Sequence, residues 1–206
     1  FEGGEGSGKS TQVSLLSRQL KNMGYEVVVT REPGGTEIGE EIRNILLDSG
    51  NKNMDYKTEV LLYAADRAQD IKERIQPALN SGKIIIADRY LDSSIVYQGY
   101  GRRLNLEMVK KINNWVVGDF YPDLTIVLDI DIEKGLKRAR NISVTKDRLE
   151  EEVMEFHQRI RKGFLEIAES EKRFEILKAD QEPDKINSII LDIIRERFPL
   201  FFKIDN

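Results

Sequence analysis

Short apolar runs alternate along the chain with longer stretches in which apolar residues recur at helical spacing. The apolar runs predict strands at 26–30, 83–88, 123–129 and 174–177. Because the first three are apolar at their centres, they fit strands that are covered on both sides. The helical stretches are predicted at 10–23, 38–47, 56–79, 105–117, 132–140, 149–170 and from Pro183 onward. Strands that alternate with helices favour a three-layer α/β/α fold around a parallel sheet.

The stretch 149–170 carries the longest amphipathic pattern. Its apolar residues recur on one helical face, at Val153, Phe156, Ile160, Phe164 and Ile167. The single histidine, His157, lies among charged residues and is predicted to be a solvated surface residue, whereas Trp115 is predicted to lie in the core. Any chemistry is therefore expected to work without an imidazole.

Composition limits the kinds of protein this can be. The 206 residues, 40% of them hydrophobic, are enough for one domain over 1–206 with a substantial core. The absence of cysteine excludes disulfides and thiolate metal sites, and it favours a reducing compartment, so a cytoplasmic location is expected. A net charge of −4 argues against a nucleic-acid polymer or an anionic membrane as partner. The apolar runs are too short to span a bilayer.

A phosphate-binding loop opens the chain. The residues match the pattern G-x-x-x-x-G-K-[ST] without a mismatch, and they are Gly3, Gly4, Glu5, Gly6, Ser7, Gly8, Lys9, Ser10 and Thr11. Backbone N–H groups of such a loop surround an anion, Lys reaches the β- and γ-phosphates of ATP, and the Ser10 hydroxyl contacts Mg²⁺. A glycine-rich turn before a helix is the alternative, but it does not need Lys and Ser there. A strand is expected before the loop, and only its last residues, Phe1 and Glu2, are present.

Ligands of a parallel sheet collect at the carboxyl ends of its strands. The loop at 3–8, the segment 31–33, Asp88 with Arg89, and Asp129 are therefore expected to converge, with Asp88 as the second ligand of Mg²⁺. Neither strand-end acid is followed by the Glu that would orient a water for hydrolysis. The segment 145–148 comes near a guanine-reading motif, but Arg148 stands where an Asp is required, which argues against a GTPase.

Basic residues near these strand ends indicate a second anion beside ATP. Two phosphates brought to about 4 Å repel by roughly 4 kcal/mol per unit charge pair at an effective dielectric near 20. The cations available to offset this are Arg43, Arg67, Arg89, Arg138, Arg140, Lys146 and Arg148. A phosphate acceptor is already ionised and needs no general base. A nucleoside monophosphate kinase follows from this reasoning.

Nearly the whole chain resembles the bacterial thymidylate kinase family. The matching motifs are F-E-G-x-E-G-S-G-K-S-T, T-R-E-P-G-G-T, E-V-L-L-Y-A-A-D-R, D-R-Y-L-D-S-S-I-V-Y-Q-G-Y-G-R, P-D-L-T-I-V-L-D and D-R-L-E. The resemblance implies a P-loop nucleoside monophosphate kinase fold, transfer of the γ-phosphate of ATP to dTMP, and a homodimer.

The same resemblance implies roles for individual residues. Glu5 approaches the deoxyribose 3′-hydroxyl, Pro33 lines the thymine methyl pocket, and Tyr63 stacks on the base. Arg67 and Arg89 hold the acceptor phosphate with Arg43 nearby. Ser94 and Gln98 face the polar edge of the base, and Tyr97 crowds the 2′ position. From spacing alone, ordinary core packing is the favoured interpretation of Tyr63 and Tyr97, and only the resemblance assigns them to the substrate site.

The family divides by the source of the cation that acts in the transition state. The loop at 3–8 contains no Arg, so a basic lid at about 141–148 is expected to supply it. Arg148 is the first candidate, ahead of Arg140, which is also expected at the ATP site, and Lys146. Lys9, Arg89 and Arg148 are thus the predicted catalytic residues.

Two other functions stay open at this point. The chain could be a switch or binding module that holds ATP without transferring phosphate, although the intact set of Lys9, Ser10, Asp88 and the arginines argues against that. It could also be a kinase for another nucleoside or monophosphate.

Overall fold

The computed structural model describes residues 1–142, 148–200 and 202. The strands are β1 (Val27–Arg31), β2 (Ile84–Asp88), β3 (Thr125–Asp129) and β4 (Phe174–Lys178). The α-helices are α1 (Lys9–Asn22), α2 (Glu37–Leu47), α3 (Tyr56–Asp70), α4 (Gln76–Asn80), α5 (Leu91–Ser94), α6 (Leu106–Val117), α7 (Ile132–Ile142), α8 (Met154–Ser170) and α9 (Pro183–Arg197). Two π-helical segments continue α3 and α5, namely η1 (Ile71–Ile75) and η2 (Ile95–Gly101).

Every strand pairing is parallel, and the first two residues join the sheet's two halves. β1 pairs with β2, and β3 pairs with β4. Between them, the Phe1 amine donates to the carbonyl of Ala87 at 2.8 Å, and the Glu2 amide donates to the carbonyl of Ile126 at 2.8 Å. The loop that follows Glu2 therefore begins in the middle of the sheet.

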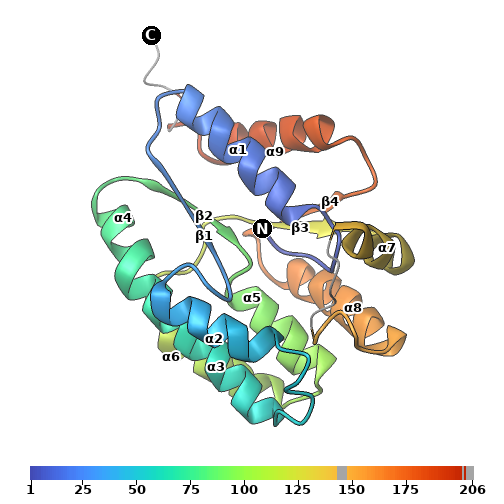
Figure 1. Cartoon of the computed structure of the whole chain (residues 1–206). Helices are drawn as coiled ribbons and strands as arrows, with labels where there is room; N and C mark the ends of the chain where they lie inside the picture. The colour runs from blue at the N-terminus through green and yellow to red at the C-terminus, as the bar shows by residue number, and fades with distance from the viewer. Residues whose placement is uncertain (143–147, 201, 203–206) are drawn as a thin grey trace.

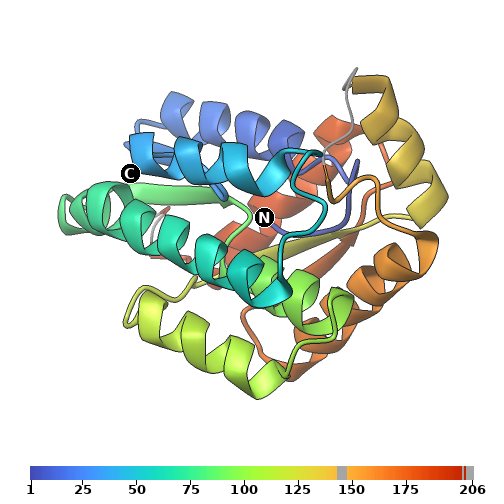
Figure 2. The same cartoon turned by 60° about the horizontal axis from the view of Figure 1, so that its bottom comes forward.

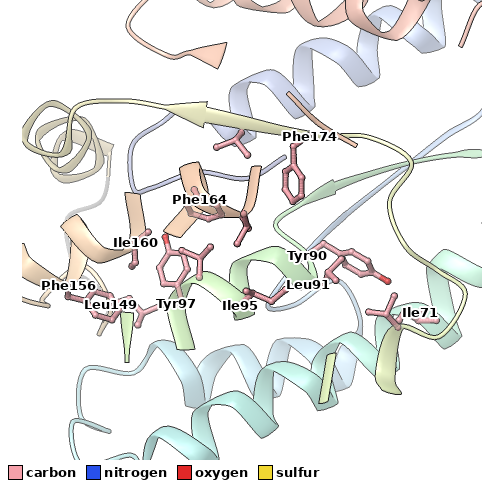
Figure 3. Packing of buried hydrophobic residues seen from close by; sticks show 14 of the residues in the cluster. Ile71, Tyr90, Leu91, Ile95, Tyr97, Leu149, Phe156, Ile160, Phe164 and Phe174 are labelled. Atoms are coloured by element: carbon pink, nitrogen blue, oxygen red, sulfur yellow. The ribbon is translucent and has the colours of Figure 1, made fainter. Parts of the chain in front are cut away.

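Helices cover both faces of this sheet, as the sequence pattern predicts. In Figure 1, α1 and α9 lie above the strands, while α8, α5 and the α2, α3 and α6 group lie below. Successive residues of β3 alternate between two cores: Ile126 and Leu128 pack with α1 and α9, whereas Val127 packs with α8 and η2. Figure 3 shows the lower core, with Tyr97 lying among Phe156, Ile160 and Phe164.

Apart from the start of the helix predicted at 149–170, the predicted helices and strands are confirmed within a few residues, with one omission. The segment 91–101, for which no element is predicted, is helical as α5 and η2. Most of its side chains are buried, so it shows no amphipathic period. The start of this helix is capped by a residue far away in sequence, because Glu2 Oε1 accepts hydrogen bonds from the amides of Tyr90 at 2.9 Å and Ser93 at 3.0 Å.

Three further predictions are wrong. The helix predicted at 149–170 begins only at Met154, and Val153 is exposed. Trp115 is 86% exposed on α6, where nothing in the described chain covers it. His157 is buried beneath the phosphate-binding loop, because it lies on the same side of α8 as Phe156 and Ile160, which are part of the core. None of the helices described is long and apolar enough to cross a lipid bilayer.

Candidate functional site

The glycines of the loop at 3–8 allow it to pass between two neighbouring backbones. Gly3 has φ +139°, and a Cβ there would lie 2.5 Å from the carbonyl oxygen of Leu128 in β3. A Cβ on Gly6, at φ +64°, would overlap the carbonyl of Gly135 in α7. A Cβ on Gly8 would meet nothing within 4 Å, so the loop stays open at the start of α1. This helix start has unpaired N–H groups and the positive end of the helix dipole, which suit a phosphate.

Lys9 lies inside this loop and contacts its carbonyls. Its Nζ donates to the carbonyl oxygens of Gly4 at 2.9 Å and Gly3 at 3.1 Å. Burial, with the charge of Arg89 nearby, lowers the pKa of Lys9 to about 8. The ammonium group is therefore held where it can meet the phosphates of a nucleotide, and it lacks a carboxylate partner within hydrogen-bond distance among the described residues.

Ser10 and Asp88 form the pair that could hold a metal ion. The Ser10 hydroxyl donates to Asp88 Oδ2 at 2.5 Å, although the two residues are 78 positions apart. An open cleft of about 960 Å³ leads to this pair along α1. Magnesium takes oxygen ligands and often binds through one or two protein groups together with substrate phosphates and water. The pair fits that chemistry, and the described residues contain no larger cluster that could hold a metal by itself.

Arg89, Glu5 and Tyr97 form a compact group beside the loop. Arg89 donates to Glu5 at 2.8 Å and to the Gly3 carbonyl at 3.0 Å, and the Tyr97 hydroxyl donates to the same Glu5 oxygen at 2.6 Å. Burial alone would raise the pKa of Glu5, but Arg89, Lys9 and the Tyr97 hydroxyl lower it to about 2. Glu5 is therefore an ionised acceptor at physiological pH.

Arg89 also adopts an uncommon backbone conformation, with φ +66°. For a residue with a side chain this left-handed conformation costs about 1–2 kcal/mol. It is held in place by the Arg89 amide, which donates to the Phe1 carbonyl at 2.9 Å, and by Glu2, which anchors Ser93. Sequence reasoning overlooks Glu2 because no pattern links it to a helix ninety residues later.

Arg67 lies in a second, fully buried group. It is 1% exposed, and it donates to Glu32 at 2.6 Å, to Ser94 at 3.2 Å and to Asn113. Burial raises the pKa of Glu32 to about 8 in spite of this arginine. Arg67 and Arg89 thus contact consecutive serines, Ser94 and Ser93. Each arginine also forms an ion pair, Arg67 with Glu32 and Arg89 with Glu5.

The remaining predicted acceptor residues surround these two groups. Pro33 is buried, and its carbonyl accepts a hydrogen bond from Arg43 at 2.8 Å. Tyr63 is buried on α3. Gln98 is buried on η2, and its Nε2 donates to Glu59 at 2.8 Å. Pro33 comes from the loop at 31–36, Tyr63 from α3 and Gln98 from η2, and the backbones of α3 and η2 lie next to each other (Figure 2).

The predicted lid cations occupy different environments. Arg148 is 6% exposed, and its guanidinium lies 2.5 Å from Glu59 and donates to the Leu46 carbonyl at 3.0 Å. Arg140 is exposed near the end of α7, and its neighbour Ala139 lies close to Gly6 of the loop. Lys146 and the rest of 143–147 lie outside the described residues. Arg148 is therefore held on the acceptor side, away from solvent.

Five residues that were not predicted from the sequence contact the predicted site residues or their chain neighbours, or line a cavity next to them. They are Glu2, Glu32, Glu59, Ser93 and His157. His157 lines a small cavity under the loop together with Gly3, Gly4 and Glu5. The motif E-V-L-L-Y-A-A-D-R contains Glu59, but on a predicted helix it is indistinguishable from a solvated acid.

Comparisons with known proteins agree with this geometry. The family model described as Thymidylate kinase matches residues 1–190. A thymidylate kinase of Halothermothrix orenii is 55% identical over 189 residues, covering 91% of this chain and 90% of that protein. One of Finegoldia magna is 45% identical over 197 residues, covering 96% and 97%. The crystal structure of thymidylate kinase from Ehrlichia chaffeensis superposes with a TM-score of 0.78 at 32% identity, covering 95% of this chain and 96% of that one. The chain belongs to the thymidylate kinase family.

Proposed function

We propose that the chain phosphorylates dTMP with ATP, giving dTDP and ADP, where the loop at 3–8 meets Arg89 and η2. Membership of the thymidylate kinase family supports this reaction. The observation that carries the site assignment is the contact of Arg89 with both Glu5 and the Gly3 carbonyl. Through this contact Arg89, which we propose binds the acceptor phosphate, lies against the loop at 3–8, which we propose binds the phosphates of ATP.

The residues of the loop act on the donor. The N–H groups at the start of α1 and Lys9 bind the β- and γ-phosphates, while Ser10 and Asp88 are the groups that would hold magnesium. Magnesium held there would supply positive charge that offsets the negative charge on the phosphates while the bond from the γ-phosphorus to ADP breaks. When ATP binds, Lys9 breaks its hydrogen bonds to the carbonyls of Gly3 and Gly4 and donates to phosphate oxygens instead.

The residues of η2 and its surroundings orient the acceptor. Arg89 binds the dTMP phosphate against the γ-phosphate, and Glu5 accepts a hydrogen bond from the 3′-hydroxyl. Tyr97 closes the sugar pocket, Tyr63 stacks on the base, and Ser94 and Gln98 face its polar edge, with Pro33 and Arg43 lining the pocket. Arg67 can bind the dTMP phosphate only if it gives up its ion pair with Glu32. An ionised phosphate oxygen attacks the γ-phosphorus and ADP leaves, so no protein base is required.

A panel of acceptors tests the function. With Mg·ATP and dTMP, dCMP, AMP or GMP, we expect ADP release to be fastest with dTMP. Coupled spectrophotometric detection of ADP and mass detection of dTDP measure it. Activity with AMP or dCMP and none with dTMP would contradict the assignment. ATP binding without product in a single turnover would instead support the binding-module alternative.

Separate substitutions test the two described lid arginines. We propose that Arg148 leaves Glu59 when the lid closes and stabilises the transferring phosphoryl group, whereas Arg140 contributes to ATP binding. Arg148→Met is then expected to lower kcat by about 10³-fold, the smaller effect known for arginines in such roles. Arg140→Met should mainly raise the KM for ATP. A lowered Tm with unchanged kcat in Arg148→Met would leave that residue with a structural role only.

The assembly is proposed to be a cytoplasmic homodimer of single-domain protomers. Exposed apolar residues on three neighbouring helices, α2, α3 and α6, support a second copy of the chain as their cover. They are Ile38, Ile45, Leu61, Met108 and Trp115. Sedimentation of the wild type and Trp115→Glu tests the dimer.

A further inference from the structure

A buried carboxylate, Glu59, lies behind the proposed base-reading residue Gln98. Glu59 is on α3, which packs against η2, and it is 0% exposed. Its Oε1 accepts from Gln98 Nε2 at 2.8 Å and Arg102 Nε at 3.2 Å. Its Oε2 accepts from Arg102 Nη2 at 3.1 Å and lies 2.5 Å from Arg148. Among the described residues, each hydrogen bond and ion pair to this carboxylate comes from a donor group.

The two arginines keep Glu59 ionised. Burial would raise its pKa, but the hydrogen bond and charge of Arg102, with help from Gln98 and Arg148, lower it. An ionised carboxylate can only accept hydrogen bonds, whereas an amide side chain can donate or accept depending on which way it is turned. Gln98 must therefore turn its nitrogen toward Glu59. The side-chain oxygen of Gln98, Oε1, receives no hydrogen bond from the described residues.

We propose that Glu59 sets the base specificity of the acceptor site by holding Gln98 with its carbonyl toward the substrate. This rests on the proposed function, in which Gln98 faces the polar edge of the base. A carbonyl accepts from the N–H at ring position 3 of thymine or uracil. Cytosine has an unprotonated nitrogen there, and two acceptors facing each other repel. The pair Glu59 and Gln98 thus favours pyrimidines that carry N–H at this position and disfavours cytosine.

Glu59→Gln tests the orientation. An amide at position 59 can donate to Gln98, so Gln98 is able to turn and present its NH₂ to the base. We expect the ratio of kcat/KM for dTMP to that for dCMP to fall at least about tenfold, mostly through a lower KM for dCMP. The ratio for dTMP to dUMP should stay at its wild-type value, because both bases carry N–H at position 3. General loosening of the pocket would change both ratios. An altered position of Arg148 would change kcat for all acceptors alike and leave the ratios unaffected.

The exchanged double variant Glu59→Gln/Gln98→Glu supplies the rescue. It retains one carboxylate beside Arg102, and the acid at position 98 presents only acceptors to the base, so the dTMP preference should return. Glu152→Gln is the matched control, because Glu152 also pairs with Arg102 but makes no hydrogen bond to Gln98 among the described residues, and this variant should keep the wild-type ratio. Circular dichroism verifies folding of each variant.

The outcomes separate the inference from the function on which it rests. An unchanged dTMP to dCMP ratio in folded Glu59→Gln, or a lowered ratio in the folded double variant, would overturn the inference. If Glu59→Gln does not fold, the double variant decides alone. If the wild type itself does not phosphorylate dTMP, the proposed function fails first. Gln98→Met with unaltered specificity would remove Gln98 from the base contact and the inference with it.

Discussion

Replacement of Lys9 by alanine is expected to lower kcat by about 10²–10³-fold, the usual cost of removing one preorganised donor of a charge-stabilising site. Lys9 donates to carbonyls of its own loop, where it is positioned before ATP arrives. Because its contact strengthens as charge builds on the transferring group, the loss should appear in kcat more than in the KM for dTMP. Lys21→Ala, on the exposed face of the same helix, is the control. A kcat within threefold of wild type would contradict the role of this lysine.

Proton uptake gives an independent measure of the same residue. The pKa of Lys9 in the nucleotide-free chain is about 8, below its ordinary value of 10.5, and phosphates raise it again. Between these values the free side chain is largely neutral, so ATP binding takes up a proton and ATP affinity falls as the pH rises. Calorimetry at about pH 9 in buffers of different ionisation enthalpy measures the uptake, which should be absent in Lys9→Ala.

The parts of the site that could be predicted from the sequence are those that local patterns define. The loop at 3–8 is contiguous, and its glycines, Lys9 and Ser10 follow from backbone geometry and anion chemistry alone. Asp88 is found because it ends a strand, and parallel strands end at one edge of the sheet. The structure places Asp88 2.5 Å from the Ser10 hydroxyl, so this topological argument locates the acid correctly.

The partners of buried charges could not be predicted, because they depend on which elements meet in three dimensions. Arg67 and Arg148 look like free cations in the sequence, yet the fold gives them Glu32 and Glu59. Glu2 caps α5 from the other end of the chain. The exposure of Trp115 and the burial of His157 likewise depend on what packs against one helix face, which periodicity does not specify. The errors therefore concern tertiary pairing far more than local structure.

Replacement of Arg89 is expected to have the largest effect, because the arginine stabilises both the fold and the proposed phosphate contact. Arg89→Ala leaves Glu5 as a mostly buried carboxylate without its ion-pair partner, which should lower the free energy of unfolding by about 3–5 kcal/mol. It should also lower kcat/KM for dTMP by about 10³-fold, comparable to other arginines that act on transferring phosphates. Urea unfolding and steady-state kinetics measure the two effects.

A double variant separates these two contributions of Arg89. In Arg89→Ala/Glu5→Gln no carboxylate remains unpaired, so most of the lost stability should return while kcat/KM stays low. The pH dependence should change as well, because Arg89 is the largest of the groups that hold the pKa of Glu5 at about 2, below its ordinary 4.5, and its removal raises that pKa. In the wild type, the ionised Glu5 therefore adds stability that is present above pH 4.5 and is lost as the pH falls toward 2, and this pH-dependent gain should be smaller in the single variant. If the double variant recovered full activity, Arg89 would serve only to neutralise Glu5, and the acceptor phosphate would need another binding site.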